Sequence, residues 1–362
     1  MSTFRVAAER LTILEHPNAD ALELAQVGLY RAVVAKGAFR TGQFALYIPE
    51  QAVLPEPLIA ELGLTGRLAG SQANRVRAVR LRGELSQGIV CVPGAVADLD
   101  LAKAAQEGVD FAELLGLTKW IPPVPVAMSG EVESAPDLIR WIEIENIKRY
   151  PDIFEPGEPV VATEKLHGTA CLYTYIPAEG RGYVSSKGFG ARLLALEPTE
   201  GNLYWRAVRQ FALPEVAKAV AEQFGADRVG LFGEVYGAGV QDLHYGANAG
   251  LDETIGFALF DAAVDVDGQE RFLTADELDS LAGLLFPDLP RVPELYRGPY
   301  DESALLGLAA GRETVSGRGA HLREGLVVRS AVERYSARLG GRAIAKFVSD
   351  DYLTRKGGTE YE

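Results

Sequence analysis

The segment Ala162-Thr-Glu-Lys-Leu-His-Gly-Thr169 decides how this chain is interpreted, because it places a lysine in a turn between two predicted strands. The flanking segments, Val160–Thr163 and Ala170–Ile176, are rich in the β-branched and aromatic residues that favour strands. A Lys-x-x-Gly pattern alone is weak, since at average lysine and glycine usage it occurs by chance roughly once in about 250 residues. Its meaning therefore depends on the rest of the chain.

Five further segments follow in order, most of them with charged residues at or near predicted strands. They are Ser185-Ser-Lys187-Gly, Leu231-Phe-Gly-Glu234-Val-Tyr-Gly, Gly256-Phe-Ala-Leu-Phe-Asp261, Arg323-Glu324-Gly-Leu-Val-Val-Arg and Ala343-Ile-Ala-Lys346-Phe. In the second of them, the two-residue period of a strand puts Phe232, Glu234 and Tyr236 on one face. This predicts an aromatic surface next to a carboxylate.

Strand candidates alternate with helical stretches from about Asp137 onward, and helices are predicted at Leu203–Phe211, Pro214–Phe224 and Ala275–Leu285. No Gly-rich loop joins a strand to a helix at phosphate-binding spacing, so we expect a mixed α+β domain over residues 137–362. Residues 1–120 have short strands separated by turn residues, which favours a small β-barrel of the OB type. The Pro-rich residues 121–136 are the predicted linker.

Composition restricts the classes of function. With 362 residues and a net charge of −14, the protein is not expected to coat nucleic acid by bulk electrostatics. One basic island lies at residues 62–83, where Arg75, Arg77, Arg80 and Arg82 alternate along a predicted strand and are candidates for nucleic-acid binding. No apolar run reaches the length of a membrane span, so no membrane partner is expected. Two isolated cysteines, Cys91 and Cys171, are typical of a reducing cytoplasm.

The ordered segments resemble the covalent nucleotidyltransferase superfamily of RNA ligases, DNA ligases and capping enzymes. The form Lys-x-His-Gly and the OB-like module ahead of the other domain make the Deinococcus-type RNA ligases the most similar group. The resemblance implies an α+β fold with an N-terminal OB-like β-barrel, followed by an ATP-grasp-like nucleotidyltransferase domain of antiparallel sheets with flanking helices. It also implies ATP-dependent joining of RNA 3′-OH and 5′-phosphate ends, in RNA repair, through a lysyl–AMP intermediate and an AMP-capped 5′ end.

The resemblance assigns roles to particular residues. Lys165 would be the nucleophile that carries AMP, Lys346 would contact the α-phosphate, and Glu234 and Glu324 would be catalytic carboxylates that bind Mg²⁺ or Mn²⁺. The residues expected at the bound nucleotide are Glu164, His167, Gly168, Ser186, Lys187, Phe232 and Val327. The chemistry agrees with these roles, because a lysine attacks phosphorus only when neighbouring cations and desolvation lower its pKa.

Three positions depart from the superfamily pattern. His167 stands where Asp is usual, Ala170 where Arg is frequent, and Ile344 where many ligases have a second lysine. The alternatives are a non-catalytic RNA-binding adaptor with a nucleotide-sensing domain, a capping-type guanylyltransferase and a DNA ligase. Domain order disfavours the last two, since their OB module normally follows the catalytic domain. The sequence leaves open whether the RNA ends lie in a nicked duplex, an RNA–DNA hybrid or a tRNA break, and it leaves open the oligomeric state.

Overall fold

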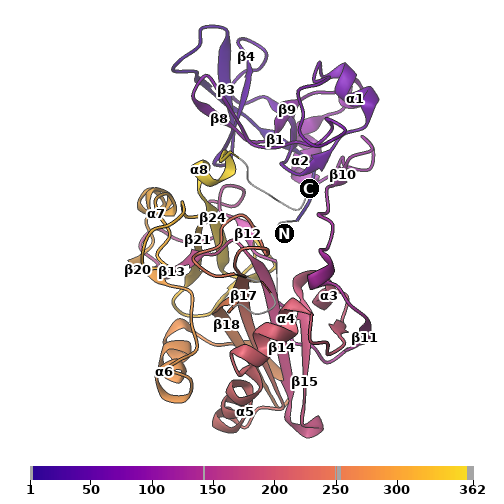
Figure 1. The fold of residues 1–362 in the computed structure, drawn as a ribbon. Helices are drawn as coiled ribbons and strands as arrows, with labels where there is room; N and C mark the ends of the chain where they lie inside the picture. Colours follow the sequence, from indigo (N-terminus) through magenta and orange to yellow (C-terminus); the bar gives the residue numbers. More distant parts are fainter. Residues whose placement is uncertain (1–2, 142, 249, 251–253, 357–362) are drawn as a thin grey trace. The chain divides into compact units, whose positions relative to one another are not determined.

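The computed structural model describes residues 3–141, 143–248, 250 and 254–356, and it divides into two units (Figure 1). Of the described residues, unit 1 contains 3–122 together with 145–151, and unit 2 contains those within 123–144 and 152–356. The sequence had assigned residues 145–151 to the second domain. The structure corrects that division, and the reason lies in the packing of this short segment on unit 1.

Unit 1 is built from short antiparallel strands. Its elements are β1 (Ala7–Arg10), β2 (Thr12–Glu15), β3 (Leu22–Val27), β4 (Tyr30–Ala35), β5 (Phe44–Ile48), β6 (Ala52–Val53), α1 (Glu56–Glu61), β7 (Val79–Leu81), β8 (Glu84–Ser86), β9 (Ile89–Cys91), α2 (Leu101–Glu107), β10 (Thr118–Lys119) and β12 (Glu145–Asn146). The strand orders β1-β5-β9 and β2-β3-β4 give the curled sheets of a small barrel. This architecture confirms the predicted N-terminal OB-like module.

The segment at residues 145–151 belongs to unit 1 because of specific contacts. The amide of Leu29 donates to the carbonyl of Lys148 (2.8 Å), and Lys148 Nζ donates to Gln87 Oε1 (2.8 Å). At the adjoining β3–β4 turn, Gly28 has φ +55°, and a Cβ there would lie 2.6 Å from the Lys148 carbonyl oxygen. Only glycine therefore fits the turn on which this segment packs.

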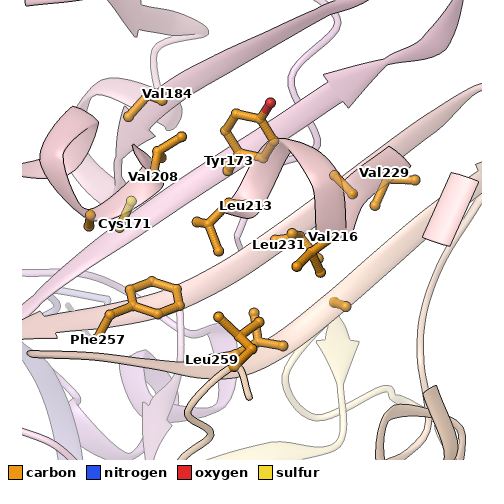
Figure 2. Packing of buried hydrophobic residues seen from close by; sticks show 14 of the residues in the cluster. Cys171, Tyr173, Val184, Val208, Leu213, Val216, Val229, Leu231, Phe257 and Leu259 are labelled. Carbon is orange, nitrogen blue, oxygen red and sulfur yellow. The ribbon is translucent and has the colours of Figure 1, made fainter. Parts of the chain in front are cut away.

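Unit 2 contains a seven-stranded sheet in the order β11-β16-β15-β14-β17-β18-β19. Its strands are β11 (Val132–Ser134), β14 (Thr169–Ile176), β15 (Arg181–Ser186), β16 (Leu194–Leu196), β17 (Arg228–Tyr236), β18 (Gly256–Val266) and β19 (Gln269–Phe272). Three helices, α4 (Leu203–Gln210), α5 (Leu213–Phe224) and α6 (Ala275–Leu285), contribute to the core on one face, where Leu213 and Val216 pack with Leu231 (Figure 2). The predicted helices are thus confirmed to within a residue.

A second sheet of unit 2 contains neighbouring strands in the order β20-β13-β21-β24. They are β13 (Pro159–Lys165), β20 (Glu294–Pro299), β21 (Gly325–Ser330) and β24 (Ile344–Val348); short β22 (Tyr335–Ser336) and β23 (Gly341–Arg342) form a hairpin, and the remaining helices are α3 (Lys187–Gly190), α7 (Glu302–Ala309) and α8 (Asp350–Leu353). β13 ends at Lys165, and the chain crosses through a three-residue turn to β14 of the seven-stranded sheet. The lysine therefore lies where the chain passes between the two sheets.

Among the residues that the structure describes, no helix is long and apolar enough to cross a membrane. Cys91 and Cys171 are both buried free thiols. Burial raises the pKa of the Cys91 thiol to about 12, so it stays protonated at neutral pH. Both cysteines are therefore packing residues rather than nucleophiles.

Candidate functional site

Lys165 is held at the end of β13 by a carboxylate from the neighbouring strand region. Lys165 is in register with Gly325 of β21. Its Nζ lies 2.7 Å from Oε1 of Glu324, the residue before Gly325. The lysine side chain is 26% exposed, whereas that of Glu324 is only 9% exposed. The amine is thus oriented by a buried acceptor while it remains accessible to a ligand.

The turn after Lys165 requires glycine for a steric reason. The Gly168 amide hydrogen bonds to Glu234, and a Cβ at position 168 would lie 2.2 Å from the Val235 carbonyl oxygen. The register pairs Thr169 with Val235, so the chain has no room to move away without breaking β14 from β17. Gly168 consequently brings the lysine turn against the strand that carries Glu234.

Glu234 and Glu324 form an acidic pair beside the lysine. Burial raises the pKa of Glu234 to about 7; the charge of Glu324 adds to this shift, while Lys165 and Lys187 oppose it. Oε2 of Glu324 is buried and has no hydrogen-bond partner among the described residues. An unpaired buried carboxylate oxygen is costly, and a hard cation would satisfy it.

This donor set fits a divalent cation that is completed by its substrate. In the described part of the chain, no group of three or more His, Cys, Asp or Glu side chains is arranged to hold a metal. Glu234 and Glu324 supply two carboxylates, so phosphate and water oxygens would have to provide the other ligands. Mg²⁺ and Mn²⁺ sites at phosphates are commonly of this kind.

Replacing Glu234 with Gln is expected to stabilise the folded protein at pH 8. The carboxyl titrates near 4.5 when unfolded and near 7 when folded, so the native state retains a proton that the unfolded chain releases in this window. The free energy of unfolding of the wild type therefore falls as pH rises from 4.5 through 7, whereas glutamine does not titrate. Urea unfolding should show a gain of about 1 kcal/mol at pH 8 that shrinks toward pH 5.

The matched control for this measurement is Glu200→Gln, which changes an exposed loop carboxylate. It should change unfolding by less than about 0.5 kcal/mol at either pH. An equal gain from Glu234→Gln at pH 5 and pH 8 would contradict the assignment, because it would show that the carboxyl does not titrate in this window.

Two lysines and a serine complete the charged and polar groups that the sequence predicted. Ser186 caps α3, its Oγ accepting from the Phe189 amide, and Lys187 at the start of α3 pairs with Glu143 at 2.8 Å. Lys346 lies on β24 in register with Val327 of β21, and both side chains are partly exposed. The charge of Lys187 opposes the upward shift in the pKa of Glu234, so the two side chains are close enough to interact.

Phe232 does not offer an exposed aromatic surface in this structure, which corrects that prediction, and its stacking on a ligand stays untested. Its side chain is fully buried, with ring centroids 5.5 Å from Trp141 and 5.7 Å from Phe272. The strand period correctly put Phe232 and Glu234 on one face, because they pair with Leu172 and Ala170, two residues apart on β14. That face is covered at Phe232 by Trp141 and Ile139, which come from a segment distant in sequence.

Glu164 is fixed away from Lys165 by a loop of unit 2. Its Oε2 accepts from the amide (2.9 Å) and the hydroxyl (2.6 Å) of Thr314, and Arg323 Nε lies 3.6 Å away. Burial raises the pKa of this carboxyl. Its Oε1 is buried and has no hydrogen-bond partner in the described ranges. A role of Glu164 at the nucleotide remains a prediction. Its Oε1 is the oxygen that could accept a hydrogen bond from a ligand.

His167 hydrogen bonds through both ring nitrogens to protein groups. Nε2 lies 2.8 Å from Asp242 Oδ1, and Nδ1 lies 2.8 Å from the Tyr352 hydroxyl. Both ring nitrogens therefore have protein partners, and contact of His167 with the cofactor stays a prediction. Asp242, Tyr245 and Tyr352 were not predicted as site residues. For Asp242 and Tyr245 the signal was the Gly-rich segment 236–246 that contains them, and Tyr352 had none.

The basic island in unit 1 divides into one buried and several surface residues. Arg75 is only 3% exposed, and its guanidinium stacks on Trp120 at 4.0 Å. It is a packing residue, which corrects its assignment to nucleic-acid binding. Arg80 lies on β7, Arg82 occupies the β7–β8 turn with φ +51°, and both are exposed. Arg77 is partly exposed.

Comparison with known proteins agrees with this site. The RNA ligase family model matches residues 158–348, more than half of the chain, and an OB-fold domain family matches residues 6–93. The chain therefore belongs to the RNA ligase family. The search of curated proteins gives no match.

Solved structures of Naegleria gruberi RNA ligase are similar over nearly the whole chain. An apo variant has 25% identity and a TM-score of 0.77, covering 98% of each chain. A variant with ATP and Mn has 25% identity and a TM-score of 0.77, covering 96% of this chain and 98% of the other. A variant with AMP and Mn has 25% identity and a TM-score of 0.78, covering 97% and 98%.

Proposed function

We propose that this protein is an ATP-dependent RNA ligase that joins 3′-OH and 5′-phosphate ends, with Lys165 as the residue that becomes bonded to AMP. One observation carries the proposal. A partly exposed lysine at a strand end lies 2.7 Å from a buried carboxylate, with Glu234 and Lys187 close enough to influence one another's charge. Membership of the RNA ligase family and the ATP, AMP and Mn in the similar Naegleria structures support the same chemistry.

In the first step Lys165 attacks the α-phosphorus of ATP. An N–P bond forms, the bond from that phosphorus to the pyrophosphate oxygen breaks, and pyrophosphate leaves with the electron pair. The lysine must lose a proton first, and Oε1 of Glu324 is the acceptor placed to take it. Glu234 and Glu324 would hold a divalent cation, which would neutralise phosphate charge when bound.

Two further transfers complete the reaction. A 5′-phosphate oxygen of RNA attacks the same phosphorus, the N–P bond breaks, and Lys165 is regenerated as AMP caps the 5′ end. The 3′-OH oxygen then attacks the RNA phosphorus and AMP leaves. Lys346 and Lys187 neutralise charge on the phosphates in these in-line substitutions, which need positioning more than covalent chemistry. Ser186 and Val327 line the nucleotide site with them.

The test is incubation of the protein with α-labelled ATP or GTP and Mg²⁺ or Mn²⁺, followed by denaturing electrophoresis. Label from ATP that survives denaturation establishes the first step, and label from GTP alone would favour the capping-type alternative. Absence of label from folded, AMP-free protein would contradict the proposal and favour the RNA-binding adaptor. Parallel joining assays with a nicked RNA duplex, an RNA–DNA hybrid and a tRNA break then distinguish substrates of RNA repair.

The surface arginines of unit 1 hold the RNA in this proposal. The β7–β8 hairpin presents Arg80 and Arg82 beside Val79 and Leu81, which are 43% and 41% exposed. Cations bind the phosphate backbone, and exposed apolar side chains suit contact with sugars and bases. Arg77 extends the same basic surface along the chain.

Substituting Arg80 and Arg82 with Ala is expected to lower joining about tenfold at 150 mM salt and to leave labelling of Lys165 unchanged. Each phosphate contact that is lost should reduce the slope of log affinity against log salt by about 0.9. Binding to a nicked duplex across a salt series measures this, with Lys36→Ala as a control from the exposed surface of the same unit. An unchanged slope would exclude the hairpin from RNA binding.

A further inference from the structure

The turn after Lys165 is held by two segments of unit 2, the loop that follows β17 and the chain that follows β24. The His167 amide donates to the Tyr245 hydroxyl at 2.8 Å, while the ring meets Asp242 and the α8 residue Tyr352. Asp242 and Tyr245 come from the loop after β17, and Tyr352 comes from the C-terminal segment. His167, two residues from the lysine, therefore joins its own turn to two other stretches of chain.

Arg355 completes this arrangement. Its Nε and Nη2 donate to the two oxygens of Asp242 at 2.9 and 3.0 Å, and its guanidinium stacks on the Tyr352 ring at 3.8 Å. A two-point arginine–carboxylate contact fixes direction as well as distance. Arg355 thus orients both of the groups that hold the histidine ring.

The charges define where the protons lie. Burial alone would raise the pKa of Asp242, but hydrogen bonds from His167 and Arg355 outweigh it and hold that pKa well below its ordinary value. An ionised Asp242 accepts from Nε2–H of His167, so in the neutral ring Nδ1 accepts from the Tyr352 hydroxyl. A single orientation of the ring satisfies both partners.

We propose that Asp242, Tyr352 and Arg355 are positioning residues for the transfer of AMP to Lys165. They fix the His167 ring and, through the adjoining Gly168, the distance from Lys165 to Glu234. The inference rests on the proposed function, because it concerns the rate of the first chemical step. It assigns the C-terminal segment to the catalytic apparatus, although none of the three residues belongs to the six motif segments.

The first test is single-turnover labelling of Lys165 over a range of ATP concentrations. Tyr352→Phe removes one hydroxyl and retains the ring, and Arg355→Ala removes the contact to Asp242. We expect each to lower the maximal rate at least tenfold while the half-saturating ATP concentration changes less than twofold. Arg355→Lys should recover part of the loss. The matched control is Lys356→Ala, which removes the adjacent exposed cation and should retain the wild-type rate.

A double variant separates positioning from general loss of stability. Because Tyr352 and Arg355 act on the same histidine, the double variant should be no more than about threefold slower than the slower single variant. Rate losses that multiply would overturn a shared action through His167. A change in the half-saturating ATP concentration alone, with the maximal rate unchanged, would also overturn the inference, because it would show a role in nucleotide binding.

A second measurement needs no catalysis. Hydrogen exchange of the peptide that spans residues 163–170 should be at least fivefold faster in Tyr352→Phe and in Asp242→Asn than in Lys356→Ala, with melting temperatures reported for each. Unchanged exchange in folded variants would overturn the inference even if labelling could not be measured. If the wild type shows no labelling, the proposed function fails. If the wild type is labelled and the Tyr352, Asp242 and Arg355 variants match it in rate and exchange, only the inference fails.

Discussion

Lys165→Ala is expected to show no covalent label from α-labelled ATP, with a loss of at least about a thousandfold, because no other group can replace an amine that forms the bond itself. Lys165→Arg should be equally inactive, since a guanidinium does not lose its proton in proteins and cannot act as the nucleophile. The exposed lysine of α5 provides the control, and Lys218→Ala should label as the wild type does.

Lys165→Ala should still seal RNA that already carries AMP at its 5′ end. In that last step the 3′-OH is the nucleophile, and Lys165 neither gains nor loses a bond. Gel analysis of a pre-adenylylated nicked duplex measures it directly. Covalent labelling of Lys165→Ala would refute the assignment of the nucleophile. Loss of sealing in a folded variant would contradict the separation of steps.

Glu324→Gln is expected to cause the second largest loss, about a hundredfold to a thousandfold in the rate of labelling at saturating metal. The amide retains the size of the side chain, but it neither accepts the lysine proton nor binds a cation as a carboxylate does. The effect should be in the maximal rate, because the 2.7 Å contact is to the reacting amine. Rapid-quench labelling at several Mn²⁺ concentrations measures it.

Excess metal distinguishes the two roles of Glu324. If cation binding is the main loss, the variant should need more Mn²⁺ and should recover part of its rate. If proton acceptance is the main loss, the rate should stay low at every metal concentration. Glu200→Gln, in an exposed loop, should match the wild type. A rate of Glu324→Gln within threefold of the wild type would exclude Glu324 from the first step.

The strand that ends at Lys165 and the turn after it could be predicted because their signals are local. The apolar alternation before Lys165, the glycine after it and the helical periodicity of residues 203–224 and 275–285 each depend on neighbours within a few residues. The family resemblance added the charged residues of the site. It implied a role for Glu324, and Oε1 of this residue lies 2.7 Å from the Lys165 amine.

The errors arose where segments distant in sequence decide exposure. Strand alternation placed Phe232 on the face of Glu234, but Trp141 and Phe272 cover it. Arg75 shares the sequence pattern of the neighbouring arginines, but its guanidinium stacks on the Trp120 ring. Residues 145–151 followed the predicted linker, yet they pack in unit 1 through Leu29 and Gln87.

The sequence by itself determined the candidate nucleophile, the order of the charged segments and the class of each domain, because these follow from motif order, residue chemistry and short-range periodicity. Only the tertiary structure decided which side chains reach the site and which are covered. Asp242, Tyr352 and Arg355 converge on His167 from segments that lie 75 or more positions away. No local pattern encodes such an approach, since it depends on how the two sheets of unit 2 and the chain after β24 pack together.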